Sequence, residues 1–480
     1  MKTIEFTLLL IFSHLSFSQN VVTWNSQSDA TTSNFGNLHP RIVMDGSGNP
    51  LLIWGNMTDE SVYFSRWNGN NFITPIKLNP AWLSVATSNW MGPDIAVKGD
   101  TVYVVVKQTP ESSSNSHIYL IRSFDKGNTF SSPIQVDFIG DSISRFPAIT
   151  IDKSGHPVVA FMKFDPSFGD SRWVISKSND YGNTFMTDVK ASNQQGGLVC
   201  DCCPGGITNS GDTIAMLYRM NNNNLRDSWV GISNDNATSF PSGFAIENNN
   251  WTISYCPSSG PDGFIEDDTL YSVFMNGIGG TLKTYLSKSS LKSTTLNSVK
   301  PLTENIMGLS SQNYPRISSD GSASAIVWRQ VVNNVVELPI LFTNDLKNGF
   351  PTQFDIVDQD EIRNADVALS NGTVFVVWED DNSGTVKYRK GTFVPVNTSI
   401  LESKTVNPFE VSYSISSRKN LFIPDGEKSH IEIFNTQGEI ILREINKSTV
   451  NISSLSEGMY FLKINTSGKF KIGKFLVVGL

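Results

Sequence analysis

The four cysteines are the most unusual chemical feature of this 480-residue sequence, because three of them lie almost side by side. Cys200, Cys202 and Cys203 precede one proline, and Cys256 precedes another. In an exported chain such cysteines form disulfides. Adjacent cysteines rarely bond each other, so we expect any disulfides to run to Cys200 and Cys256. Four converging thiolates would instead suit zinc or copper(I). The sequence leaves open whether the cluster is a disulfide staple or a metal site made by all four residues.

Arginine, histidine and aromatic side chains in loops are the second source of chemistry. An arginine binds a carboxylate through two parallel hydrogen bonds, and a histidine or tyrosine transfers protons. The candidates for catalysis are Arg145, Arg219, His39, His117 and Tyr314. The candidates for substrate binding are Arg226, Arg172, Arg363 and Trp90.

An internal repeat must position these side chains. Seven segments begin alike: the seventh has Ala365 where the other six have a proline, at Pro40, Pro93, Pro147, Pro204, Pro257 and Pro315. The spacing of roughly 50 residues is that of a four-stranded propeller blade. The following stretches are rich in β-branched and aromatic residues between Gly and Asn turns. We therefore expect an all-β propeller; seven blades fit best, and six are the alternative.

Two turns carry a more specific marker of this fold. Ser123–Phe130 and Ser178–Phe185 both read S-x-D-x-G-x-T-F, and Ser233–Phe240 is a degraded copy with Ala237 in place of the glycine. The Asp and Ser/Thr side chains of such a turn bond its backbone, and the glycine takes a conformation that other residues avoid. These turns resemble the Asp-box, or BNR, repeat of sialidase-like propellers. The resemblance implies a propeller whose Asp-box turns lie opposite the active site.

The position of a residue in the repeat predicts its place in the propeller. Loops leading into the first strand of each blade share one face with loops joining its second and third strands, and this face holds the mouth of the central funnel. Arg41 and Arg316 follow prolines, and the sequence does not decide whether they point inward. The propeller spans residues 19–396, and its last segment is short. We expect Val21–Trp24 to supply the missing outer strand and close the ring, which removes free sheet edges.

The first eighteen residues have the pattern of a signal peptide. Lys2 precedes a short apolar run, and small residues lead up to Ser18. The run is too short to span a bilayer, and no other stretch approaches that length, so we expect that the protein is not integral to a membrane. The net charge of −8 disfavours binding to nucleic acid.

A different domain follows a linker at residues 397–406. Its segments Asn407–Phe409, Ile431–Gly438, Ile452–Ile464 and Lys474–Val478 resemble the C-terminal sorting domain of the type IX secretion system of Bacteroidetes. The resemblance covers residues 407–480 and implies export by that machinery, followed by release or attachment to the cell surface. Alternating strands predict a small β-sandwich. An adhesive or carbohydrate-binding module is the alternative.

The resemblances favour a sialidase-like propeller that acts on or binds extracellular glycans or glycoproteins. A sialidase uses three arginines, an acid and a Tyr–Glu pair, but the family's early Phe/Tyr-Arg-Ile-Pro motif is missing, and Arg145-Phe146-Pro147 matches it only loosely. A polysaccharide lyase acting on uronate-rich glycans, with a His or Tyr base and a neutralising arginine, is the second interpretation. A non-catalytic binding propeller is the third, so the sequence leaves enzyme activity open.

Overall fold

The computed structural model describes residues 22–32, 34–193, 197–394, 420–422, 429–456, 458–466 and 469–477. The signal peptide expected at residues 1–18 and the linker expected at 397–406 lie outside these ranges. The chain separates into two compact units, Met1–Val396 and Asn397–Leu480, each described by itself. Within the described ranges no helix combines the length and the apolar character that crossing a bilayer requires.

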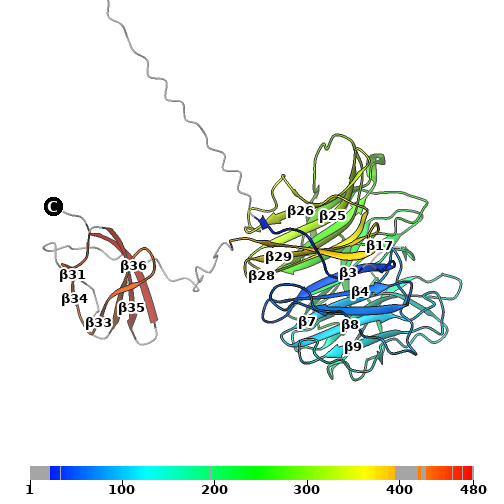
Figure 1. The fold of residues 1–480 in the computed structure, drawn as a ribbon, viewed down its shortest axis with the longest axis horizontal. Coiled ribbons are helices and arrows are strands. Elements are labelled where there is room, and N and C mark those ends of the chain that lie inside the picture. Colours follow the sequence, from blue (N-terminus) through cyan, green and yellow to red (C-terminus); the bar gives the residue numbers. More distant parts are fainter. Residues whose placement is uncertain are drawn as a thin grey trace, which may run out of the picture. The chain divides into compact units, whose positions relative to one another are not determined.

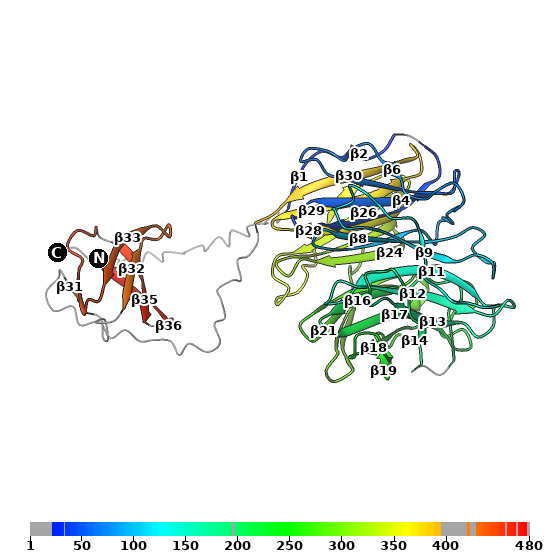
Figure 2. The same cartoon turned by 90° about the horizontal axis from the view of Figure 1, so that it is seen from below.

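The described part of the first unit forms seven antiparallel sheets of four or five strands (Figures 1 and 2). The first three sheets contain β3 (Asn37–Met44), β4 (Pro50–Asn56), β5 (Ser61–Arg66) and β6 (Ile76–Lys77); β7 (Asp94–Lys98), β8 (Thr101–Lys107), β9 (Ile118–Ser123) and β10 (Ile134–Gln135); and β11 (Ile143–Ile151), β12 (Pro157–Phe164), β13 (Arg172–Lys177) and β14 (Val189–Lys190).

The next three sheets contain β15 (Leu198–Val199), β16 (Gly206–Ser210), β17 (Thr213–Asn221), β18 (Ser228–Ser233) and β19 (Ser242–Ala245); β20 (Asp262–Glu266), β21 (Thr269–Asn276), β22 (Lys283–Ser290) and β23 (Thr295–Pro301); and β24 (Leu309–Ser319), β25 (Ser324–Val332), β26 (Val335–Thr343) and β27 (Asp355–Asp358). The last sheet contains β28 (Ile362–Ser370), β29 (Thr373–Asp380), β30 (Thr385–Thr392), β1 (Thr23–Trp24) and β2 (Ser28–Asp29). One short 3₁₀ helix, η1 (Ile278–Gly280), follows β21.

The sheets are arranged as a closed ring, which is the architecture of a β-propeller. The inner strands contact one another in the order β3, β7, β11, β16, β20, β24 and β28, and β28 in turn contacts β3. The N-terminal strand completes the last sheet as the sequence predicts, because Thr23 pairs with Thr392 and Trp24 with Gly391. Val22 is buried in the same apolar cluster as Trp378 of β29.

The core lies between the faces of neighbouring sheets. Its largest fully buried side chains include four tryptophans, Trp54, Trp173, Trp328 and Trp378. One apolar cluster joins β8 and β9 to the adjacent strands β11 and β12. A single sheet of short strands cannot bury both of its faces, whereas a ring of sheets does so without a separate helical layer.

The inner strands share a local irregularity at the start of the repeat. The pairing register of β3 shifts between Leu38 and Arg41, and the same shift occurs in β11, β24 and β28. In three of these strands the residue before the proline has a positive φ: 52° at His39, 53° at Phe146 and 52° at Tyr314. Such bulges re-aim side chains and often lie beside functional sites.

The Asp-box turns have the hydrogen bonds that their sequence predicts. The Asp125 carboxylate accepts bonds from the Thr129 N–H (2.9 Å) and hydroxyl (2.7 Å), and the Ser123 hydroxyl accepts from the Gly127 N–H (2.9 Å). The turn at Asp180 repeats this pattern. The degraded copy keeps it too, because Ala237 adopts a positive φ of 59° in the place of the glycine.

The structure corrects the predicted start of the fifth repeat. The repeat predicts this start at Pro257, whereas the inner strand β20 begins at Asp262, directly after Pro261. The prediction aligned Cys256-Pro257 with Cys203-Pro204 of the preceding repeat. Cys256 and Pro257 belong instead to the loop that precedes β20.

The second unit is also all-β. Its described strands form one four-stranded sheet, ordered β33, β32, β35 and β36, and one two-stranded sheet of β31 and β34. Their bounds are β31 (Asn420–Phe422), β32 (His430–Phe434), β33 (Ile440–Ile445), β34 (Thr449–Asn451), β35 (Gly458–Thr466) and β36 (Lys469–Val477). Residues from both sheets, including Leu421, Ile433 and Leu462, share one buried apolar cluster.

Candidate functional site

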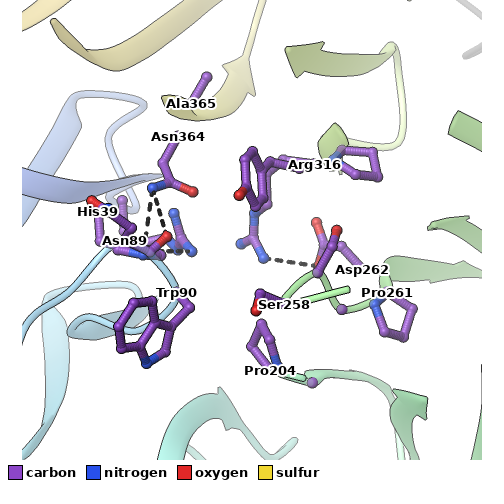
Figure 3. Close-up of a pocket in the computed structure, with 16 residues that line it drawn as sticks. His39, Asn89, Trp90, Pro204, Ser258, Pro261, Asp262, Arg316, Asn364 and Ala365 are labelled. Carbon is purple, nitrogen blue, oxygen red and sulfur yellow. Dashed lines mark hydrogen bonds and ion pairs between the residues drawn. The ribbon is translucent and has the colours of Figure 1, made fainter. Parts of the chain in front are cut away.

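A pocket lies at the centre of the ring, where loops lead into the inner strands (Figure 3). The polar and aromatic side chains that line it are His39, Arg41, Asn89, Trp90, Ser258, Ser259, Asp262, Tyr314, Arg316 and Asn364. A second cavity shares Arg41, Asp262 and Arg316 with the first and reaches along the strands to Ile95 and Ile149. The two cavities are therefore successive levels of one central funnel.

One position of the inner strands carries charged residues, namely the position after Pro93, Pro261, Pro315 and Ala365. Three aspartates on inner strands each accept a 3.0 Å hydrogen bond from a backbone N–H of the next sheet in the ring: Asp94 from Ile149, Asp262 from Ile317 and Asp366 from Ile42. Arg316 lies between two of them, 3.3 Å from Asp262 and 3.2 Å from Asp366. These four residues thus link neighbouring sheets of the ring to one another.

Arg41 differs from Arg316 because it makes no ion pair in the described part of the chain. Its Nη1 donates to the carbonyl of Pro40 at 2.9 Å, and its Nη2 lies 3.5 Å from Nδ1 of His39. Burial, and then the charge of Arg316, lower the pKa of Arg41, but a guanidinium remains protonated in proteins. The pocket therefore offers a charged guanidinium without a direct carboxylate partner.

His39 is a buried, neutral imidazole beside this guanidinium. Burial, and then the charge of Arg41, lower the pKa of His39 to about 3. Its Nε2 lies 3.4 Å from Nδ2 of Asn364. A hydrogen bond between the ring and the backbone of Asn89 opposes the lowering of the pKa but does not outweigh burial and the charge of Arg41.

Glu379 supports His39 from the adjacent sheet. Its carboxylate accepts a 2.7 Å hydrogen bond from the backbone N–H of His39 and a 3.0 Å bond from Nδ2 of Asn364. The side chain is fully buried, and burial raises the pKa of Glu379 to about 7. The bond to the His39 backbone also holds the bulge that aims the imidazole.

Tyr314 and Trp90 give the pocket its aromatic surface. Tyr314 occupies the same bulge position in β24 that His39 occupies in β3. Burial raises the pKa of Tyr314, and the positive charges of Arg363 and Arg329 oppose that shift. Trp90 is 39% exposed, so its ring is available to stack against a sugar. Of the predicted residues, the structure thus brings His39, Tyr314 and Trp90 together.

Two predicted site arginines are buried and bonded within the propeller wall, outside the pocket lining. Arg219, expected to be catalytic, is fully buried and donates to three backbone carbonyls, those of Ser259 (3.2 Å), Arg226 (2.5 Å) and Met275 (2.6 Å). Arg226, expected to bind substrate, is 6% exposed and donates to Sγ of Cys200 at 3.1 Å. Neither side chain lines the funnel, because both guanidinium groups bond to atoms within the propeller wall.

The other predicted residues lie outside the funnel lining and have local partners. Arg145 pairs with Glu111 at 2.7 Å and lies over the ring of Phe146. Arg172 pairs with Asp170 at 2.5 Å, and Arg363 with Asp381 at 3.4 Å. The Nδ1 of His117 lies 3.0 Å from the buried carboxylate of Asp137. Their roles in catalysis or binding stay predictions, and none of them touches the pocket.

The cysteines are paired as two disulfides, Cys200–Cys203 and Cys202–Cys256. The second bond joins the loops that lead into two neighbouring sheets. Disulfides are thus the state of the cluster in this structure, and zinc or copper binding stays a prediction for the reduced chain. The expectation that Cys200 and Cys256 each take part in a bond agrees with the pairing.

Asn89 and Asn364 line the pocket without having been predicted as site residues, and the sequence left the direction of Arg41 open. The signal for Arg41 was present, since it follows a repeated proline, but its direction depends on the bulge at His39. Asn364 precedes the seventh start, where Ala365 replaces the proline. Asn89 lies in a loop between sheets and carries no motif.

The second unit is identified by comparison with known families. Residues 407–478 match the secretion system C-terminal sorting domain. This match confirms the predicted type IX sorting domain and places the protein outside the cell or on its surface. No curated protein matches the chain.

The propeller is similar in fold to enzymes that act on glycans. An ulvan lyase described as a new family of polysaccharide lyase, PL25, gives a TM-score of 0.52 at 12% identity, over 77% of this chain and 96% of the lyase. The α-L-arabinofuranosidase Arb93A from Fusarium graminearum gives 0.45 at 11% identity, over 78% and 98%. Trypanosoma rangeli sialidase gives 0.43 at 11% identity, over 94% and 89%. These similarities show the propeller fold alone; membership of the Asp-box family stays a prediction.

Proposed function

We propose that this protein recognises an acidic polysaccharide outside the cell, and that Arg41 binds a sugar carboxylate in the funnel pocket. The observation that carries this proposal is the guanidinium of Arg41, which lines the pocket and has no carboxylate within ion-pair distance in the described chain. Arginine suits a carboxylate because its fixed fork of N–H donors matches the two oxygens.

The other lining residues complete a saccharide site. Trp90 offers an exposed ring, and Asn89 and Asn364 offer amides for sugar hydroxyls. Sites of this kind combine an apolar surface with a few placed polar groups. The ulvan lyase with the similar fold was solved bound to a glucuronate-containing glycan, which supports an acidic ligand class for this propeller.

Hydrolysis by a carboxylate pair has little support in the pocket. The carboxylates that line the two cavities in the described chain are Asp94 and Asp262, and both accept backbone hydrogen bonds. A glycosidase needs one acid to protonate the leaving oxygen and a second as base or nucleophile. A sialidase would need Glu379 to activate Tyr314, but the carboxylate of Glu379 is bound to His39 and Asn364 instead.

β-Elimination of a uronate is the second candidate function, favoured by the presence of His39, Arg41 and Tyr314 in the lining of one pocket. Arg41 would neutralise the carboxylate and so acidify the adjacent C–H. A neutral His39 would accept that proton, and Tyr314 would donate its phenolic proton to the leaving glycosidic oxygen. The bound carboxylate would also offset the charge of Arg41, which raises the basicity of His39.

The test is binding of oligoglucuronate by the mature chain and by Arg41→Gln. A charge-assisted hydrogen bond contributes about 1.5–3 kcal/mol, so the variant should bind roughly 10–100-fold more weakly in isothermal titration calorimetry. Arg66→Gln, on the surface of β5, is the matched control and should bind as the wild type does. Equal affinity for neutral and acidic oligosaccharides, or an unchanged Arg41→Gln, would overturn the proposal. The second candidate function is tested separately: β-elimination of oligoglucuronate forms a carbon–carbon double bond in the product, which is measured by its ultraviolet absorbance.

A further inference from the structure

The four cysteine sulfurs gather at a single point in the wall of the propeller. The Sγ atoms of Cys200, Cys202 and Cys203 lie within 4.8 Å of one another, and the Sγ of Cys256 is bonded to that of Cys202. Sulfurs around a tetrahedral zinc ion, with Zn–S near 2.3 Å, lie about 3.8 Å apart. Three of the sulfurs therefore lie close enough together to reach one ion, and the fourth is held beside them by its bond to Cys202.

A buried cation faces these sulfurs. Arg226 is 6% exposed, and its Nη1 donates to Sγ of Cys200 at 3.1 Å, whereas its buried Nε has no hydrogen-bond partner. In the described chain no carboxylate forms an ion pair with this guanidinium; Asp201 affects it only through its charge at longer range. A buried charge is costly without a counter-charge.

A disulfide does not supply that counter-charge, because its sulfurs are neutral and weak acceptors. A thiolate does, and N–H···S bonds from neighbouring residues commonly support thiolate metal centres. A negatively charged sulfur at Cys200 would supply the counter-charge that Arg226 lacks, and the reduced cluster takes that state when it binds a metal.

We propose that the reduced chain binds one soft metal ion, Zn²⁺ or Cu⁺, through Cys200, Cys202, Cys203 and Cys256, with Arg226 as the supporting cation. Each ligating thiol releases its proton to water, and no electron is transferred. Oxidation to the two disulfides of the structure is the competing fate: it removes two electrons and two protons per bond. Thiolates suit both ions because both favour sulfur ligands.

The site has an access route and a structural consequence. Cys256 is exposed while Cys200 and Cys203 are buried, so an ion enters from the Cys256 side. Pro204, Gly205 and Ser258–Pro261, which follow Cys203 and Cys256 in sequence, line the funnel pocket. Binding a metal would therefore fix one wall of that pocket without supplying a group to it, and this inference does not depend on the proposed glycan ligand.

The experiment uses the mature chain purified anaerobically with a phosphine reductant, and titrates Zn²⁺ and Cu⁺ separately against a chromophoric chelator. We expect one equivalent of at least one ion per chain, and the two titrations distinguish the metals. Arg226→Gln should weaken that binding about 10–100-fold, as other losses of metal-supporting residues do. Arg66→Gln, remote from the cluster, should not change it.

A second readout separates binding from folding. Co²⁺ substitution should give thiolate-to-metal charge-transfer absorption that Cys203→Ser weakens, and near-ultraviolet circular dichroism reports whether that variant is folded. The proposal is overturned if the reduced, folded chain takes up neither ion at one equivalent. It is equally overturned if Arg226→Gln binds as the wild type does, or if the reduced chain unfolds and binds neither ion.

Discussion

At the scale of single residues, the funnel contains buried titratable groups, and burial determines whether each of them is charged. His39 and Glu379 lie next to each other, yet burial moves their pKa values in opposite directions, to about 3 and about 7. Both shifts favour the neutral form, because a buried charge loses the hydration that it has in water. The pocket thus keeps Arg41 as its principal charged group toward a ligand.

The raised pKa of Glu379 makes stability depend on pH. The folded chain holds this proton up to about pH 7, whereas an unperturbed glutamate releases it near 4.5. The stabilising contribution of protonated Glu379 is therefore complete below pH 4.5 and is lost as the pH rises to 7. Glu379→Gln removes this titration, so the stability of the variant relative to wild type should increase from pH 4.5 to 7. Urea unfolding at successive pH values measures it.

The control for that series is Glu304→Gln, an exposed glutamate of the same propeller. Its stability should run parallel to the wild type across the same pH range. Parallel curves for Glu379→Gln as well would show that the buried carboxylate does not titrate with a raised pKa.

Residue types and repeat positions indicated which side chains could take part in chemistry, but not which of them point into the funnel. His39, Tyr314 and Trp90 line the pocket, as their positions in the repeat predict, and their roles stay predictions. Arg219 was predicted as catalytic because its loop also leads there, and only packing shows that its guanidinium binds backbone carbonyls outside the pocket lining. The direction of Arg41 stayed open for a related reason: a bulge one residue long decides which face of a strand a side chain takes.

At the scale of elements, the Asp-box turn is a repeated device whose glycine has two separate tasks. Gly127 has a φ of 77°, and a Cβ there would lie 2.3 Å from the buried ring of Phe64. Ala237 in the degraded copy keeps a φ of 59°, and its methyl group is buried in an apolar cluster. The same turn therefore tolerates a methyl group where the neighbouring strand leaves room.

This contrast predicts unequal costs for reciprocal substitutions. Gly127→Ala combines a left-handed backbone cost of about 1–2 kcal/mol with overpacking of about 1–3 kcal/mol, so it should destabilise by about 2–5 kcal/mol. Ala237→Gly relieves the first cost and loses a buried methyl worth about 0.8 kcal/mol, so it should lie within about 1 kcal/mol of wild type. Thermal unfolding measures both. Similar magnitudes for the pair would contradict the role of Phe64.

The repeat predicted elements well where each blade resembles the next, and failed where a loop imitates the start of a blade. Pro257 follows a cysteine just as Pro204 does. In the fifth repeat, however, the inner strand starts directly after Pro261 and not after Pro257. The aspartate that marks the true start, Asp262, accepts a bond from the next sheet, as Asp94 does. That bond is a tertiary contact, which a single sequence does not reveal.

At the scale of the whole molecule, the ring depends on its N-terminal strands. β1 and β2 pair with β30, and Val22 and Ala30 are buried against the last sheet and the first. Without these strands β30 becomes a free edge, and free edges pair with other chains. The fold is thus closed by residues far apart in sequence, which is why the short seventh segment pointed to the N-terminus.

A chain that begins at residue 31 should therefore be less stable than one that begins at residue 19. Burying one valine contributes about 1.5–3 kcal/mol, so loss of Val22 alone should lower the free energy of unfolding by about that amount. The exposed edge of β30 should also cause self-association in sedimentation experiments. Removing residues 397–480 is the matched control, because they form a separate compact unit. That deletion should leave the melting temperature of the propeller unchanged. Equal stability and a monomeric state for both truncations would show that the ring closes without its N-terminal strands.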